Sequence, residues 1–134
     1  MSAAVALQDA IYAALVADPG LSAQVAGRVY DNAPSSVEYP HITFGPSQEI
    51  SDDVECIAGE LHAIQIDVWT QERGSKRGNK FLCGLVKAAL REAELMLDEP
   101  YAMSSLRVAD VQYMGDPRTD VAHGVISIEA RTEG

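Results

Sequence analysis

Residues 61–97 read LHAIQIDVWTQERGSKRGNKFLCGLVKAALREAELML, and within this stretch the spacing of apolar residues changes from two to three and four. The first part alternates, with Ile64, Ile66, Val68 and Thr70 on one side and Leu61, Ala63, Gln65, Asp67 and Trp69 on the other. This alternation predicts a strand over residues 61–71. We expect the more apolar set, which begins at Ile64, to pack against helices.

The second part of the same stretch predicts a helix after a turn at residues 72–74. Apolar residues recur there at helical spacing and form one stripe: Phe81, Leu82, Leu85, Val86, Ala89, Leu90 and Ala93. We expect Ser75 to be the N-cap of this helix and Gly74 to supply the unusual backbone dihedral of the corner. Gly78 and Gly84 each cost a helix about 1 kcal/mol relative to alanine, so burial of the stripe must stabilise it. The helix therefore needs a sheet beneath it.

The composition is that of an ordinary globular chain, with 47% hydrophobic and 22% charged residues. A length of 134 residues predicts a single domain over residues 1–134. The N-terminal stretch lacks the basic and apolar segments of a signal peptide, and no run approaches the roughly 18 apolar residues of a membrane span. Twenty acidic against ten basic residues give a net charge of −10, which disfavours groove binding to DNA or RNA.

The rest of the chain supplies one more long helix and several strands. The patterns predict a helix over 3–17, a short helical turn over 21–25 begun by Ser22, a loop over 31–40, strands over 41–47, 106–114 and 121–132, and a hairpin with an acidic tip over 48–59. In the strand at 106–114, we expect Val111 and Tyr113 on one side and Val108 on the other. This order predicts an α+β fold, a mostly antiparallel sheet of about four to five strands with two main helices packed on one face.

The other face of this sheet is expected to be polar, with a single large aromatic residue. We place six residues on it: Gln65, Asp67, Trp69, Ser127, Glu129 and Arg131. A face of this kind is either solvated surface or the place where a partner chain docks. The two interpretations stay open at this point, and Trp69, Asp67, Glu129 and Arg131 are the candidate assembly residues.

The sequence predicts no catalytic, cofactor or metal site. Motifs for phosphate binding, nucleophilic catalysis and paired metal ligation are absent, and the three histidines, His41, His62 and His123, lie on separate expected strands. Asp52 and Asp53 are adjacent on an exposed hairpin, where their carboxylates are expected to point apart and to stay solvated. Cys56 and Cys83 are distant in sequence and are expected to be free thiols. A small enzyme or ligand-binding domain is the alternative from another functional class.

Short stretches along most of the chain resemble a family of tail-completion proteins, which includes tail terminators of long-tailed phages and of gene transfer agents. The similar stretches are ALQ at 6–8, AL at 14–15, DPGL at 18–21, GRVYD at 27–31, YPHIT at 39–43, IDVWT at 66–70, RG at 73–74, HGV at 123–125 and IEARTE at 128–133. The family has no catalytic signature, so the resemblance implies a role and no individual functional residues. The acidic, alanine-rich style is most similar to the gene transfer agent members.

The resemblance implies a structural virion protein that is assembled in the bacterial cytoplasm and forms a ring, expected to be a hexamer, at the head-proximal end of the tail tube. Its expected partners are its own copies, the tail tube protein and the head-tail connector, with DNA only in transit. Besides the outer sheet face, the candidate contacts are the hairpin Gln48–Gly59 and the loop Asn32–Tyr39, and Asp52, Asp53 and Glu55 are the candidate channel lining. The alternative within the same particle is a neck or head-tail connector component.

Overall fold

The computed structural model describes residues 2–53, 58–116 and 119–134. Its elements are α1 (Ala3–Ala17), α2 (Pro19–Val25), β1 (Val29–Tyr30), β2 (His41–Ser51), β3 (Gly59–Gln71), α3 (Arg77–Glu92), β4 (Ala102–Asp116) and β5 (Val121–Glu133). The strands form one sheet in the order β1-β2-β3-β5-β4, in which only the short β1 pairs in parallel with its neighbour. The α+β prediction is therefore confirmed, and α1 has the predicted bounds.

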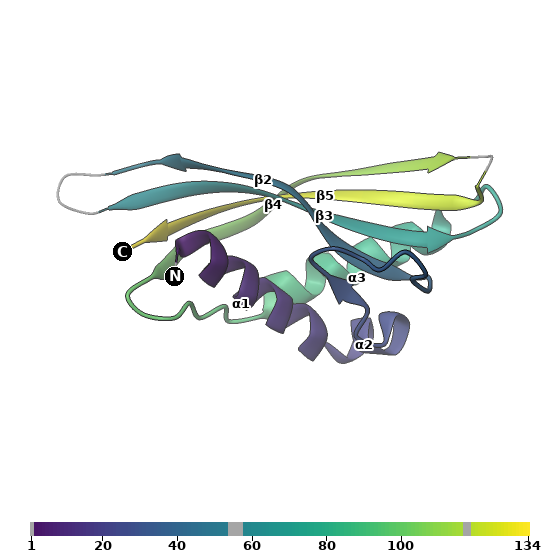
Figure 1. Ribbon diagram of the computed structural model, residues 1–134, viewed down its shortest axis with the longest axis horizontal. Coiled ribbons are helices and arrows are strands. Elements are labelled where there is room, and N and C mark those ends of the chain that lie inside the picture. The colour runs from purple at the N-terminus through teal and green to yellow at the C-terminus, as the bar shows by residue number, and fades with distance from the viewer. Residues whose placement is uncertain (1, 54–57, 117–118) are drawn as a thin grey trace.

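The helices all lie on one side of the sheet (Figure 1). The core fills the space between them, and its fully buried side chains come from α1, α2, α3 and the inward positions of β2, β3 and β5: Leu7, Ile11, Leu15, Leu21, Val25, Ile42, Ile66, Val68, Val86, Ile126 and Ile128. As predicted, Ile66, Val68 and Thr70 belong to the helix side of β3. Strands β2 and β3 continue past the helical layer toward one end of the molecule (Figure 1).

The start of α3 differs from the prediction. Gly74 has the expected positive φ of 76°, but the N-cap position is Lys76, which provides no side-chain cap. Ser75 lies one residue earlier than predicted for a cap, and its hydroxyl still accepts the N–H of Arg77 at 3.1 Å. The carboxylate of Glu72 takes over this role by accepting the backbone N–H groups of Gly78 at 2.8 Å and Asn79 at 3.0 Å. A carboxylate at this end of a helix also complements the helix dipole.

The buried face of α3 is rotated from the predicted stripe. Phe81, expected in the core, is 59% exposed, whereas Asn79 and Cys83 are fully buried together with Leu82, Val86, Ala89 and Leu90. The Asn79 amide donates to the backbone carbonyls of Val68 at 2.9 Å and Ala122 at 3.2 Å. A side chain at Gly124 would overlap Asn79 and Cys83, so glycine lets the helix approach β5 closely. The buried face of α3 therefore includes the polar Asn79, which anchors the helix to the sheet, and not Phe81.

Two further differences have local causes. Helix α2 begins at Pro19 and not at Ser22, because the Asp18 side chain accepts the N–H of Leu21 at 3.0 Å and caps the helix. In β4 the pairing with β5 shifts between Val108 and Asp110, a bulge that places Val108 on the same side as Val111 and Tyr113. The prediction that Val108 faces the other way is wrong for this reason.

The thiol of Cys83 is free and buried, as expected, whereas Cys56 lies outside the described residues. None of the helices in the described part of the chain has the length and apolar character needed to cross a membrane.

Candidate functional site

The sheet face turned away from the helices, called the outer face below, carries the predicted assembly residues at two separate places. Trp69 is paired across β3 and β5 with His123, and Asp67 with Val125, toward the α3 end of β3. Glu129 and Arg131 pair with Ala63 and Leu61, toward the β2–β3 hairpin. Eight residues separate Leu61 from Trp69 along β3, which is roughly 26 Å at the usual rise per residue. The predicted residues therefore form two groups and not one patch.

Trp69 is half-buried at the centre of an aromatic row that we call the Trp69 cluster: Tyr39, His41, Trp69 and His123. The indole stacks on the His123 ring with centroids 3.8 Å apart and an interplanar angle of 11°, and the His41 ring lies on its other side at 6.2 Å. The indole N–H donates to Thr43 Oγ1 at 3.0 Å. Such a fixed ring, which keeps part of its surface exposed, is well suited to contact another protein.

His41 and His123 are functional candidates that sequence reasoning missed. The three histidines do not meet, because His62 points to the helix side of the sheet, but two of them flank Trp69. Only the pairing of β2 with β3 and of β3 with β5 brings them together. Burial lowers the pKa of His41; the hydrogen bond with the Glu38 carbonyl opposes this shift and the charge of Arg28 adds to it.

Asp67 is not an exposed member of the outer face as predicted, because it is only 5% exposed. Its carboxylate lies 2.7 Å from His123 Nε2 and accepts a hydrogen bond from the Gln65 amide at 2.9 Å. Gly45 on β2 makes room for it, since a side chain there would approach Asp67 Oδ2 within 2.6 Å. Asp67 therefore orients the His123 ring against Trp69.

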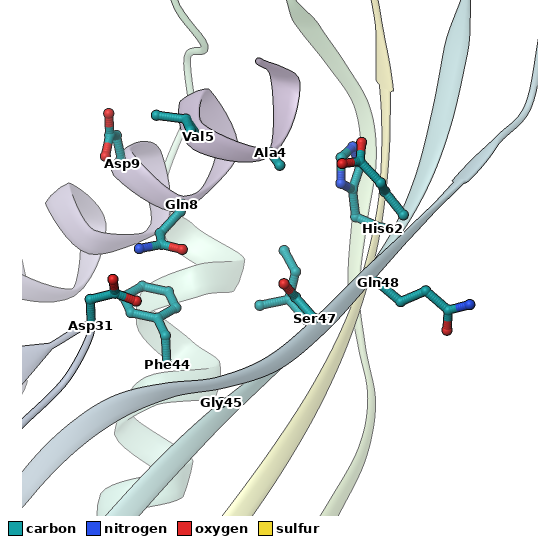
Figure 2. A pocket seen from close by; sticks show the side chains of 12 residues that line it. Ala4, Val5, Gln8, Asp9, Asp31, Phe44, Gly45, Ser47, Gln48 and His62 are labelled. Carbon is teal, nitrogen blue, oxygen red and sulfur yellow. The ribbon is translucent and has the colours of Figure 1, made fainter. Parts of the chain in front are cut away.

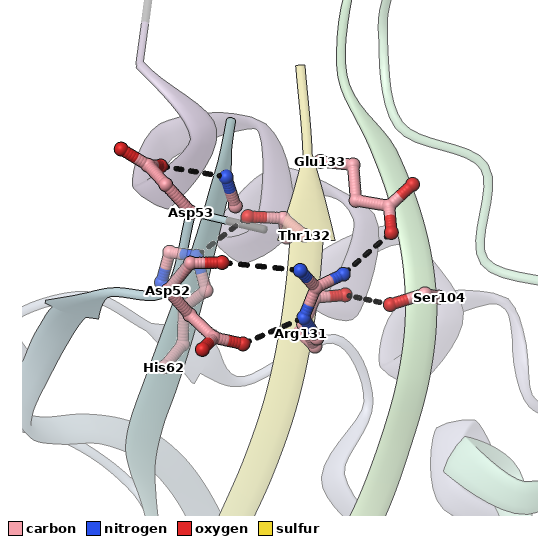
Figure 3. Close-up of polar contacts among 8 residues, drawn as sticks. Asp52, Asp53, His62, Ser104, Arg131, Thr132 and Glu133 are labelled. Carbon is pink, nitrogen blue, oxygen red and sulfur yellow. Dashed lines mark hydrogen bonds and ion pairs between the residues drawn. The ribbon is translucent and has the colours of Figure 1, made fainter. Parts of the chain in front are cut away.

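The second group is held together by ion pairs. Arg131 binds Asp52 Oδ2 through Nε at 2.8 Å and also contacts Glu133 (Figure 3). These hydrogen bonds, that to Asp52 first, raise the pKa of Arg131. Glu129 and Arg107 form an exposed pair on the outer face at 2.7 Å. Exposed pairs of this kind contribute little to folding stability.

Two acidic residues of the hairpin, Asp52 and Asp53, bind groups within the chain. Asp52 is bound by Arg131, and Asp53 Oδ1 accepts the N–H of Gly59 at 3.0 Å, so the two neighbours point apart as expected (Figure 3). Glu55 lies outside the described residues. Beside them on the outer face, the cross-strand pair Ile50 and Leu61 is 55% and 44% exposed. The hairpin therefore combines an apolar contact with fixed charges.

The predicted contact loop Asn32–Tyr39 ends against the Trp69 cluster. Tyr39 meets His41 edge-on with ring centroids 4.9 Å apart, and the Tyr39–Pro40 peptide is cis. Arg28 donates to the Pro40 carbonyl at 2.9 Å and lies 3.7 Å from the Glu38 carboxylate. The loop and the Trp69 cluster thus form one continuous surface.

Comparison with known proteins places this fold in a family. The family model described as tail completion protein gp17 matches residues 9–133. The chain belongs to this family. Its members are structural proteins of phage tails and not enzymes, so the small-enzyme alternative is set aside, and the protein is a tail completion component of a phage or phage-like particle.

Two solved structures are similar over nearly their whole length. A chain from the structure titled "Virion of native gene transfer agent (GTA) particle" has 26% identity and a TM-score of 0.81, covering 99% of this chain and 98% of that one. The bacteriophage SPP1 gp17 protein has 21% identity and a TM-score of 0.63, covering 96% and 89%, which shows the shared fold. A search of curated proteins found no match.

Proposed function

We propose that this tail completion protein forms a ring of six copies at the head-proximal end of the tail tube, where it ends tube polymerisation and joins the tail to the head connector. The observation that carries the proposal is the likeness of almost the entire chain to a chain of a gene transfer agent particle. A ring position also suits the outer face. Each ring contact joins two different patches, and this chain offers two apolar spots about 26 Å apart.

The first spot is the Trp69 cluster, which the exposed side chain of Met114 extends because Met114 pairs with His123 across β4 and β5. The second is the Ile50 and Leu61 pair on the hairpin. Exposed large apolar side chains of this kind are typical of contact sites, and the ion pairs next to the hairpin add charge complementarity. These two apolar sites would bind neighbouring copies of the chain, the tail tube protein or the connector.

The test is to produce particles without this protein and to examine their tails by electron microscopy. Tube termination predicts tails of uncontrolled length that are not joined to heads, and supplying the wild-type protein should restore both features. Normal tail length without joining would identify a neck or connector component and would overturn tube termination. Normal particles would overturn both roles. Cryo-electron microscopy of complete particles should show a six-fold ring where tube and connector meet.

The channel of this ring is proposed to be lined by carboxylates, because lysine and arginine would bind the DNA backbone and slow its passage. Six copies at −10 each would carry −60. The lining is assigned to Asp52, Asp53 and Glu55, of which Asp52 is bound by Arg131 within the chain. Changing these three residues to lysine should leave assembly intact and slow DNA delivery. Delivery at the normal rate would contradict the assignment.

A further inference from the structure

Three potential metal ligands converge on the helix side of the β2–β3 hairpin. Glu49 and His62 are direct cross-strand partners, and Glu60 lies two residues before His62 on the same face of β3. One ligand atom from each of the three side chains lies within 4.8 Å of the others. His62 is buried, and its Nε2 lies 3.9 Å from Glu60 Oε2. Two ligands of one Zn²⁺ ion are at most about 4.2 Å apart, so an ion fits between these two atoms.

The two carboxylates of this group are not neutralised by the chain itself. Glu60 Oε2 is shielded from solvent but has no hydrogen-bond partner, which is unusual for a carboxylate oxygen. In the described part of the chain, neither glutamate forms an ion pair with lysine or arginine. A cation would satisfy the unpaired oxygen and remove the repulsion between the two carboxylates.

The third ligand, His62, is buried at 4% exposure on the helix side of β3. Thr132 Oγ1 lies 2.9 Å from Nε2 without an ion, so a cation bound at Nε2 would take the place of this hydrogen bond (Figure 3). An ion can also enter. His62 and Glu49 line an open cavity of about 410 Å³ between α1 and the sheet (Figure 2), and Glu49 and Glu60 line a second of about 280 Å³.

We propose that Glu49, Glu60 and His62 form a binding site for one divalent transition-metal cation, of which Zn²⁺ is the representative. One imidazole nitrogen and two carboxylate oxygens are a ligand set for Zn²⁺ or Mn²⁺, whereas Mg²⁺ and Ca²⁺ prefer sites made of oxygen only. The cation lies between the two carboxylates and the imidazole and joins β2 to β3 beside the cavity that α1 borders. The site thus belongs to the hairpin that carries the Ile50 and Leu61 contact.

The experiment titrates EDTA-treated, dialysed full-length protein with ZnCl₂ and separately with MgCl₂ in a calorimeter. Wild-type protein should bind one Zn²⁺ per chain and bind Mg²⁺ much more weakly. Glu60→Gln and Glu49→Gln keep the side-chain volume and should each weaken Zn²⁺ binding about tenfold or more. The matched control is Glu129→Gln, which removes the same charge from the outer face and should leave the affinity unchanged. Zn²⁺ should also raise the melting temperature of the wild type but not of Glu60→Gln.

Three results would overturn the site. The first is the absence of stoichiometric Zn²⁺ binding to wild-type protein. The second is equal affinity of wild type and Glu60→Gln, which would move the ion elsewhere, for example to His123 and Asp67. The third is an equal loss in Glu129→Gln, which would mean that net charge alone attracts the ion. Because Glu60 is partly exposed, its glutamine variant should fold, and circular dichroism before titration checks this.

Discussion

Replacement of Trp69 by alanine tests whether the outer face is an assembly surface. In the isolated chain, the substitution removes the stack on His123 and the hydrogen bond to Thr43. Full burial of tryptophan is worth about 3–5 kcal/mol against alanine, and Trp69 is half-buried, so packing contributes about 2 kcal/mol. The stack and the hydrogen bond bring the expected loss of folding free energy to about 3 kcal/mol. The melting temperature should therefore fall by roughly 10 °C.

Assembly should suffer beyond this loss of folding stability. If Trp69 is an anchor of the interface, its truncation weakens association by about 2 kcal/mol or more. The assay adds purified variants to particles that lack the protein, at a temperature well below their melting points, and counts complete particles. Trp69→Phe is the matched control, since it keeps an aromatic ring in the stack and loses only the N–H. A folded Trp69→Ala variant that completes particles as well as wild type would refute the interface.

Three further predictions follow from contacts within the chain. Glu72→Ala should lower the free energy of unfolding by about 1–2 kcal/mol in thermal melts, because α3 loses its cap, while Glu99→Ala on the surface should have little effect. Burial raises the pKa of Cys83 to about 12, so iodoacetamide should label this thiol in unfolded but not in native protein at pH 8, and equal rates would contradict its burial. Burial lowers the pKa values of His41 and His62, so below pH 6.5 the unfolded chain binds more protons than the folded one, and the free energy of unfolding should decrease as the pH is lowered. In denaturant titrations at several pH values, His41→Gln should make this decrease smaller. The same pH dependence in wild type and variant would exclude His41 as a cause.

The fold could be predicted because local periodicity determines it. The change from alternation at Ile64–Thr70 to helical spacing after Gly74 requires only neighbouring residues, and it correctly predicted β3 and α3. Which face of α3 is buried could not be predicted from local periodicity. Hydropathy favours Phe81 for the core, but the hydrogen bonds of Asn79 to two strands decide which side of the helix is buried.

The candidate site was predicted less completely, because it depends on contacts between distant segments. Trp69 could be placed on the outer face from its position in the alternation, but its stacking on His123 depends on the register of strands more than 50 residues apart in sequence. The buried state of Asp67 has the same origin, since His123, Gln65 and the space beside Gly45 create it. The bulge after Val108 also left no signal in the alternation of that strand.

The contact of Asn79 with the sheet has a mechanical consequence. Its amide holds carbonyls of two different strands, and Gly124 leaves no space between helix and sheet for sliding. A shift of α3 by one residue along its axis, about 1.5 Å, would break both hydrogen bonds of the Asn79 amide. The side chain therefore fixes the position of α3 along β3 and β5. A pulling force applied to the exposed side of α3 is transmitted through Asn79 to both strands at once.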